Sequence, residues 1–375
     1  MRKGKLILMI MMHCFLANAQ TDCPAVVKFK AMYSADNNFK QLIDSMLLNV
    51  QPLPDGSQNF WKNKNVTDLY LFLNKWFYTL PTVSNGLDDI IQFSLLYYHN
   101  TYGLRFVNEE PGLSWTMHFV NEQGKFMDSR QSTGSISQWL SDSSLHNNEY
   151  ITPLNGYQSF NQFFTRSLKP GMRPVARPDD NSVIVSPVDG IIDWVKIDLK
   201  ADSTLPVKGR MRLSLNQLLG NSKFTNTFID GTVLSVILLP RNYHHFHSPV
   251  SGELVESKEH VGNILFGSQL MDFFMTGKDD FSVFENYKHG YFIIKTKQYG
   301  YVAMVPVGLE TVGSVVFENR VKNISAGKEV MISKGEKLGH FAYGGSMVML
   351  LFEKNRMTSL TVQQGQQIGM FNHSE

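Results

Sequence analysis

Three short segments of this chain carry side chains that together could cut a peptide bond. One is the Gly-Gly-Ser sequence at residues 344–346, which the apolar run 347–352 follows. The other two are Ser-Pro-Val-Asp-Gly at 186–190 and Tyr-His-His-Phe-His-Ser-Pro at 243–249. They supply a serine, a carboxylate and several imidazoles. A serine hydroxyl becomes a nucleophile when a base takes its proton and an acid orients that base.

The chemistry available to Ser346 is attack on its own backbone. Its hydroxyl would have to reach the carbonyl carbon of Gly345, an unusual approach that glycine permits because it lacks a Cβ. The resulting ester would lose an α-proton, eliminate the preceding chain and leave dehydroalanine, which hydrolyses to a pyruvoyl group. The products would be a β chain ending at Gly345 and an α chain of residues 346–375. The alternative is an ordinary glycine turn before a buried strand.

Histidines supply the candidate bases. His244, His245 and His247 fall within four positions, and imidazoles titrate near neutral pH, which suits proton transfer in both directions. A metal site is the rival interpretation, but the segment offers no evident third ligand, so we expect no metal. A surface histidine cluster is the other alternative. Asp189 stands in Pro-Val-Asp-Gly, which alone would indicate a hairpin turn.

Taken in order, these segments resemble the phosphatidylserine decarboxylase family. The family's entry motif is similar to Phe-Phe-Thr-Arg-Ser-Leu-Lys-Pro-Gly-Met-Arg-Pro at 163–174. Further matching segments are Val-Pro-Val-Gly at 305–308 and Val-Gly-Ser-Val at 312–315, and the resemblance covers roughly residues 155–356.

The resemblance implies a carboxy-lyase that makes its own pyruvoyl cofactor. Asp189, His247 and Ser346 match the self-cleavage triad, and His244 matches the histidine implicated in proton transfer during decarboxylation. The pyruvoyl group, formed from Ser346, would bind the substrate amine as a Schiff base and serve as the electron sink, without metal or pyridoxal phosphate.

Two departures from the family pattern bear on this expectation. Met347 follows the cleavage serine where the family usually has Ser or Thr. Residues 285–289, Glu-Asn-Tyr-Lys-His, replace a charged Asn-Glu-Arg-type stretch before a predicted strand. The first concerns the rate of processing and the second the contacts with phospholipid.

The sequence predicts an α+β protein with a boundary near residue 150. Apolar residues at i, i+3 and i+4 predict helices over 39–50, 67–80 and 88–98, so residues 20–150 are expected to form a helical domain. Residues 151–375 are expected to form the β-rich catalytic domain. Shorter helices are predicted at 135–145, 157–167 and 213–219, and strands at 183–185, 191–195, 232–239, 291–296, 300–307 and 347–352.

Two substrate classes and a non-catalytic alternative stay open. Phosphatidylserine, converted to phosphatidylethanolamine with release of CO₂, is the family default. The helical extension, with Trp76, Trp115 and Trp139, is similar to the branch that contains soluble tryptophan decarboxylases, so a free aromatic amino acid is the runner-up. The third hypothesis is a scaffold that no longer processes. A homodimer stays open as well.

The N-terminal end of the chain indicates an exported protein. Arg2, Lys3 and Lys5 precede a mostly apolar stretch, and Ala-Asn-Ala at 17–19 has the form of a signal-peptidase site, so residues 1–19 are expected to be a signal peptide. Its apolar run is shorter than the roughly 20 residues that a spanning helix needs. Cys23 would then be alone in the mature chain, without a disulfide. A net charge of +2 gives no case for nucleic-acid binding, and the remaining expected partner is a membrane surface, contacted peripherally.

Overall fold

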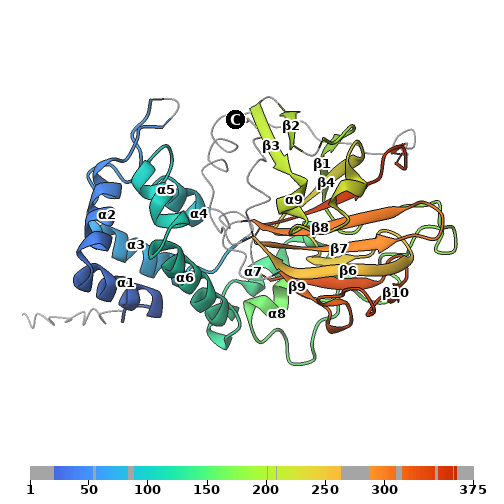
Figure 1. Cartoon of the computed structure of the whole chain (residues 1–375). Helices are drawn as coiled ribbons and strands as arrows, with labels where there is room; N and C mark the ends of the chain where they lie inside the picture. Colours follow the sequence, from blue (N-terminus) through green and yellow to red (C-terminus); the bar gives the residue numbers. More distant parts are fainter. Residues whose placement is uncertain are drawn as a thin grey trace, which may run out of the picture.

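The protein has a helical N-terminal part and a β-rich C-terminal part, which confirms the predicted α+β class (Figure 1). The computed structural model describes residues 21–53, 56–82, 88–200, 202–207, 209–262, 288–309, 315–342, 345–357 and 359–360. The expected signal peptide and residues 285–287 lie outside these ranges. Within them, no helix combines the length and the apolar character that crossing a membrane requires.

Six helices form most of the described N-terminal part, and side-chain caps set the starts of α2, α3 and α5. Asp36 accepts hydrogen bonds from the backbone N–H groups of Asn38 and Phe39 at the start of α2. Asn65 and Asp68 form a reciprocal capping box at the start of α3, which satisfies two donors that a helix end otherwise leaves unpaired. The helices are α1 (Pro24–Ala35), α2 (Asn37–Leu48), α3 (Val66–Tyr78), α4 (Asp88–Ser94), α5 (Thr101–Asn108) and α6 (Gly112–Met127).

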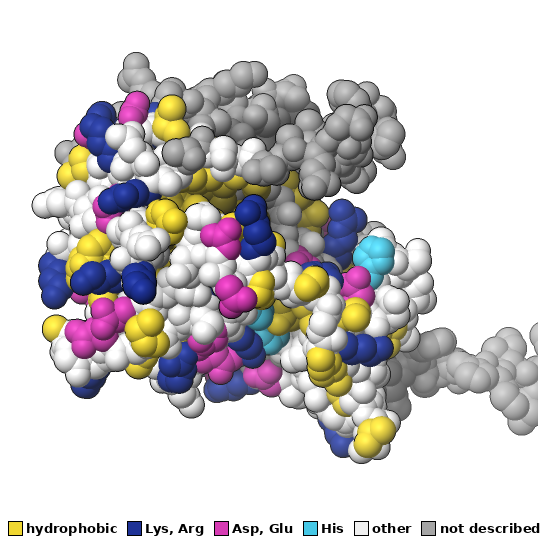
Figure 2. Space-filling model, turned by 90° about the vertical axis from the view of Figure 1, so that its right-hand side faces the viewer, with side chains coloured by type: hydrophobic (Ala, Val, Ile, Leu, Met, Phe, Trp, Pro, Cys, Tyr) yellow, Lys and Arg dark blue, Asp and Glu magenta, His cyan; other side chains and the backbone are white. Residues whose placement is uncertain are grey.

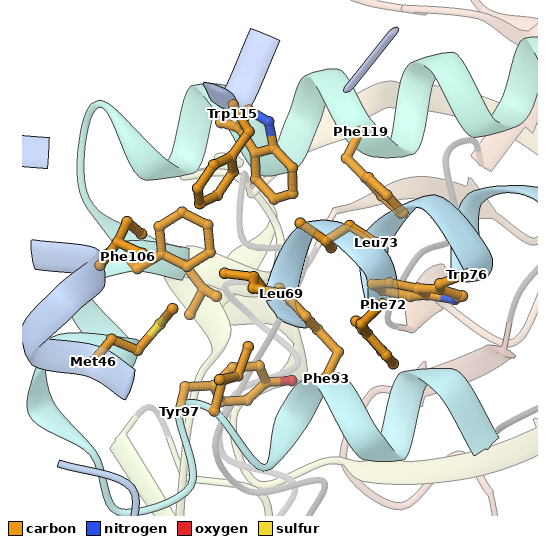
Figure 3. Packing of buried hydrophobic residues seen from close by; sticks show 14 of the residues in the cluster. Met46, Leu69, Phe72, Leu73, Trp76, Phe93, Tyr97, Phe106, Trp115 and Phe119 are labelled. Atoms are coloured by element: carbon orange, nitrogen blue, oxygen red, sulfur yellow. The ribbon is translucent and has the colours of Figure 1, made fainter. Parts of the chain in front are cut away.

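Aromatic side chains fill the core of these helices (Figure 3). The rings of Trp76 and Phe119 lie 4.7 Å apart, and those of Phe29 and Trp115 lie 4.8 Å apart in an edge-to-face arrangement. The indole N–H of Trp115 donates to the carbonyl of Ala25 at 2.9 Å, so its polar atom is satisfied inside the core. Core packing therefore accounts for these tryptophans.

Short elements connect the two parts. Helix α7 (Ile136–Ser141) and helix α8 (Phe160–Phe164) are both shorter than the predicted spans 135–145 and 157–167. Ser159 caps α8 by accepting from the N–H of Gln162. In Figure 1 both helices lie between the N-terminal helices and the strands.

Antiparallel strands make up the C-terminal part. A seven-stranded sheet has the order β1-β4-β12-β8-β7-β6-β10, a three-stranded sheet the order β5-β11-β9, and β2 and β3 form a hairpin. The strands are β1 (Ile191–Lys196), β2 (Asp202–Val207), β3 (Gly209–Ser214), β4 (Thr232–Leu238), β5 (His245–His247), β6 (Gly252–Val261), β7 (His289–Lys295), β8 (Tyr301–Leu309), β9 (Val315–Phe317), β10 (Val330–Ile332), β11 (Lys337–Phe341) and β12 (Gly345–Phe352). The predicted helix at 213–219 is α9 (Leu215–Leu218).

Strand β12 is buried on both faces, which explains its uninterrupted apolar sequence. Val348 and Leu350 belong to the core that includes side chains of the three-stranded sheet. Met347, Met349 and Leu351 belong to a separate core on the opposite face of the large sheet, together with side chains of α9. Because side chains alternate along a strand, Ser346 shares the face of Val348 and Leu350.

The strand predicted at 183–185 is absent, and a buried lysine explains why. The ammonium of Lys334 donates to the carbonyls of Arg177, Asp180 and Val183 at 2.7, 2.8 and 3.2 Å. Lys334 is only 6% exposed, so these carbonyls compensate the burial of its charge. The segment therefore wraps around an ammonium group and does not extend along a neighbouring strand.

Candidate active site

Ser346 lies near the start of the central strand and is sealed from solvent. It pairs with Leu238 of β4 on one side and Gly308 of β8 on the other, and its exposed fraction is 0%. Its side chain faces the three-stranded sheet, and His244 immediately precedes the first strand of that sheet. The packing of the two sheets therefore brings together residues 102 positions apart in the sequence.

His244 is the imidazole that contacts Ser346. Its Nδ1 lies 3.1 Å from Ser346 Oγ, and its Nε2 lies 3.3 Å from the carbonyl oxygen of Pro240. A carbonyl can only accept, so Nε2 carries the hydrogen and Nδ1 presents a lone pair to the serine hydroxyl. The ring of Phe164 stacks on this imidazole at 3.9 Å between centroids. Complete burial lowers the pKa of His244 to about 3, which keeps it neutral near pH 7.

His247 lies in a different hydrogen-bond setting. Its Nδ1 donates to the carbonyl of Gly335 at 2.8 Å, and its Nε2 lies 3.2 Å from the hydroxyl of Tyr243. Burial lowers its pKa from the usual histidine value. No hydrogen bond in the described part of the chain joins His247 to Ser346 or to Asp189. The carbonyl of Gly335 fixes the tautomer of His247, so Nε2 is available to accept the tyrosine proton.

Asp189 is held by an arginine that the sequence analysis did not single out. The Arg173 guanidinium binds both carboxylate oxygens of Asp189, at 2.8 to 3.2 Å, and also reaches Glu149 at 2.7 Å. The hydrogen bonds to Asp189 raise the pKa of Arg173. The structure thus brings His244 and Ser346 together, whereas the family resemblance implied His247 as the histidine of the triad with Ser346. It places Asp189 with Arg173 and Glu149, without a hydrogen bond to His247 among the described residues.

The residue after Asp189 has to be glycine. A Cβ on Gly190 would lie 2.5 Å from the carbonyl oxygen of Ile237 in β4, closer than such atoms approach. Asp189 therefore precedes a close crossing of two backbones, at the point where the chain enters β1. The Asp-Gly pair is not the turn of a hairpin between two strands, since residues 183–185 are not a strand.

Met347 does not enter the space between Ser346 and His244. Its side chain is fully buried in the core on the opposite face of the sheet, together with Met349. The departure from the family pattern at this position thus leaves the contact between the serine and the imidazole intact.

A cavity of about 540 Å³ lies beside the segment that leads into β12. Its walls come from α6, from the region of α8 and from the ends of β9 and β11. Ala342, on the wall, is three residues before Gly345, and His340 also lines the cavity. The remaining wall is largely polar, with side chains such as Asn121, Gln162 and Thr165. Helix α6 of the N-terminal part therefore lines this cavity together with β9 and β11.

Charges on the sheet-side surface do not form a single-sign patch. Figure 2 shows basic and acidic side chains interspersed over this face of the molecule. Exposed ion pairs such as Lys337 with Glu318 and Lys354 with Asp230 contribute to this pattern.

Comparison with known proteins agrees with the motifs. The family model described as phosphatidylserine decarboxylase matches residues 160–371, more than half of the chain. A phosphatidylserine decarboxylase proenzyme of Fusobacterium nucleatum is 33% identical over 261 residues, which cover 68% of this chain and 82% of that protein. Phosphatidylserine decarboxylase proenzyme 2 of rice is 30% identical over 282 residues, 74% of this chain and 43% of the rice protein. The fission yeast proenzyme 3 is 33% identical over 239 residues, only 23% of its own length.

A buried serine at the start of a central strand, in contact with a neutral imidazole, places a hydroxyl and a base next to the Gly345 peptide bond. The extent of the family match goes further: the chain belongs to the phosphatidylserine decarboxylase family, whose members are carboxy-lyases. The match begins at Phe160, the first residue of α8, so most of the helical part precedes it.

We expect the folded protein to lose stability when the pH falls below about 6.5. Burial lowers the pKa values of both His244 and His245 to about 3, so the unfolded chain takes up protons that the folded chain excludes. The neutral imidazoles make their full contribution to the free energy of unfolding when the pH is above the histidine pKa of the unfolded chain. That contribution is lost as the pH falls towards the histidine pKa values of the folded protein. At pH 5 each contributes a loss of about 2 kcal/mol. Urea unfolding at pH 7 and pH 5 measures the difference.

The matched control for this pH dependence is His260, whose side chain is 68% exposed. His260→Gln should leave the difference between pH 7 and pH 5 unchanged, whereas His245→Gln should reduce it. Equal free energies of unfolding at the two pH values in the unaltered protein would contradict the expectation.

Proposed function

We propose that this protein is a self-processing, pyruvoyl-dependent decarboxylase that converts phosphatidylserine to phosphatidylethanolamine and releases CO₂. The observation that carries the proposal is the 3.1 Å contact between Ser346 Oγ and the unprotonated Nδ1 of His244. Family membership and the proenzyme names of the relatives support it.

The first step is attack of Ser346 on the preceding peptide bond. In the present arrangement His244 Nδ1 accepts the hydroxyl proton while Oγ attacks the carbonyl carbon of Gly345. The imidazole is neutral because of its burial and is oriented by the Pro240 carbonyl, so it is ready to act as a base. The absence of solvent exposure at Ser346 keeps water from competing for the base.

Asp189 and His247 remain predicted participants in this step. For His247 to act on Ser346, its imidazole would have to leave Tyr243 and Gly335. Asp189 likewise would have to leave Arg173. We propose that in the arrangement described here they hold the loop around the site, His247 through Tyr243 and Asp189 through Arg173.

The later steps build the cofactor at residue 346. Collapse of the adduct breaks the C–N bond between Gly345 and residue 346, so that the nitrogen of residue 346 takes up a proton and an ester remains. Loss of the α-proton from this ester releases Gly345 as a carboxylate and leaves dehydroalanine, which takes up water and releases the nitrogen as ammonia. The pyruvoyl group that results supplies a carbonyl that takes up the substrate amine and accepts electrons when CO₂ departs. His244 then lies beside the reacting carbon, where its nitrogen can hold the proton that replaces the lost carboxylate.

The residues around Ser346 fit such a group. A small carbonyl group at position 346 would replace a side chain of similar size, beside a neutral imidazole and the stacked ring of Phe164. The tryptophans that suggested a free aromatic substrate are buried in helical cores, where packing explains them. Phosphatidylserine is therefore the substrate that the observations favour.

We propose that the mature protein is exported and meets its lipid at a membrane surface. The proposal rests on the signal-like residues 1–19, which lie outside the described ranges. Fractionation of cells that produce the full chain, with mass determination of its N-terminus, tests it. A retained N-terminus at Met1 in the cytosolic fraction would contradict it.

Intact mass spectrometry of the purified protein, with and without hydroxylamine, tests the proposed chemistry. The expected result is a 30-residue fragment that begins at position 346, carries a blocked N-terminus and gains the mass of an oxime. Phosphatidylserine in mixed micelles and free tryptophan are then supplied separately, and CO₂ is measured. A single uncut chain would refute the enzyme, and CO₂ from tryptophan alone would refute the substrate.

A further inference from the structure

Arg166 is a buried cation close to the proposed reaction centre. Its side chain is only 3% exposed, and its guanidinium carbon lies 4.1 Å from the ring centre of Tyr150 and 4.6 Å from that of Phe163. One nitrogen, Nη1, donates to the carbonyl of Phe163 at 3.3 Å. The Nε and Nη2 groups are buried and have no hydrogen-bond partner among the residues that the structure describes.

The local contacts leave this charge uncompensated. No ion pair joins Arg166 to an acidic side chain among the described residues. Two aromatic faces attract a guanidinium only weakly, whereas burying an unpaired ion is much more unfavourable. Burial accordingly lowers the pKa of Arg166, although a guanidinium keeps its proton. An anion with two acceptor oxygens would satisfy both free donors and the charge.

The position of Arg166 links this anion to the reaction. Arg166 follows Thr165, whose carbonyl accepts from His245, and Phe164, whose ring stacks on His244. Burial is the main cause of the low pKa of His244, and the hydrogen bond to the Pro240 carbonyl opposes it. The positive charge of Arg166 lowers this pKa further. Ser346 and His244 are themselves fully buried, and Phe164 of α8 covers one face of the His244 ring.

We propose that Arg166 binds the phosphodiester of the substrate head group and so selects phosphatidylserine over a free amino acid. The inference rests on the proposed function and adds its specificity determinant. A phosphodiester offers two oxygens that can accept hydrogen bonds from Nε and Nη2. It also carries the same negative charge in the substrate and in the product. Binding the reacting carboxylate would instead be strongest before CO₂ leaves, which would stabilise the ground state and slow the reaction.

Kinetics of processed, full-length variants test the proposal. Arg166→Met removes the charge at similar volume, Arg166→Lys keeps the charge without the paired donors, and exposed Arg105→Met is the control. We expect Arg166→Met to cleave itself normally but to raise KM for a short-chain phosphatidylserine by about 10- to 100-fold, because hydrogen bonds to charged groups are lost. The rise for Arg166→Lys should be smaller, and Arg105→Met should match the unaltered protein.

A second measurement does not depend on folding of the methionine variant. Inorganic phosphate should compete with phosphatidylserine in the unaltered protein, and the inhibition constant should rise at least tenfold in Arg166→Lys. An unchanged KM in a cleaved Arg166→Met protein, a loss confined to kcat, or no competition by phosphate would overturn the inference. Each of these results requires an active unaltered enzyme, whereas failure of the proposed function would appear as no CO₂ from the unaltered protein.

Stability separates this role from a structural one. Replacing a buried unpaired ion by an apolar side chain of similar volume is often neutral or stabilising. We therefore expect Arg166→Met to melt at or above the temperature of the unaltered protein in the absence of phosphate. Phosphate should raise the melting temperature of the unaltered protein and leave that of Arg166→Met unchanged. A methionine variant that gains as much from phosphate would contradict the assignment.

Discussion

Ser346→Ala is expected to leave the protein as one uncut chain without decarboxylase activity. The substitution removes the hydroxyl that attacks Gly345, and with it the oxygen that must leave with Gly345 for dehydroalanine, the precursor of the cofactor, to form. Two functions depend on one oxygen, so the loss should be complete and not merely a slower rate. Mass spectrometry after prolonged incubation, together with CO₂ release from phosphatidylserine, measures both.

The fold should survive this change at a moderate cost. Removing the hydroxyl leaves His244 Nδ1 buried without a partner, which costs about 1–3 kcal/mol. Ser235 provides a matched control, because it is a fully buried serine of the neighbouring strand β4 and its hydroxyl has no hydrogen-bond partner. Ser235→Ala should cleave normally. A Ser346→Ala protein that still separates into two chains at 345/346 would contradict the assignment of the nucleophile.

Elements with strong local signals were predictable from the sequence. The helices α2 and α3 follow from apolar spacing and nearby capping residues, and the predicted spans 39–50 and 67–80 agree with them within two residues at each end. Strand β12 was predicted because six neighbouring positions are apolar, which both core faces require. In each case the information lies within about fifteen residues.

Contacts across long separations were harder to predict. The segment near residue 180, where a strand was predicted, instead binds the ammonium group of Lys334 through three carbonyls. No local sequence pattern indicates a partner about 150 positions away. Arg173 was noticed only as part of a motif, although it clamps Asp189. The sequence signal for this pair is the opposite charge of Arg173 and Asp189, 16 positions apart. It identifies a contact only when the path of the chain between the two residues is known.

The sequence predicted which residues form the candidate site more accurately than it predicted which of them contact one another. The resemblance named Ser346 and His244, and the structure brings these two together. It also placed Asp189 and His247 in the triad with Ser346, and these two roles stay predictions. Which of two histidines three positions apart touches a distant serine depends on where β5 begins. His244 lies just before that strand and His247 within it, so the two imidazoles leave the backbone in different surroundings.

His244→Ala is expected to lower the rate of decarboxylation strongly. This imidazole is the one that touches Ser346 Oγ among the described residues, and after processing it would lie beside the reacting carbon. Proton transfer by a positioned side chain is worth about 10²- to 10⁴-fold in rate, so turnover per pyruvoyl group should fall by that factor. Exposed His260→Ala is the control and should match the unaltered enzyme.

Self-cleavage of the same variant assigns the base of the first step. If the His244→Ala precursor stays whole, His244 takes the serine proton, as the contact indicates. If it splits while His247→Ala stays whole, His247 takes that proton, as the family resemblance implies, and His244 acts only on the substrate. His244→Asn sharpens the distinction, because its amide can hydrogen-bond Ser346 but cannot hold the proton. Full turnover in both His244 variants would refute a chemical role for this imidazole, since only its position would then matter.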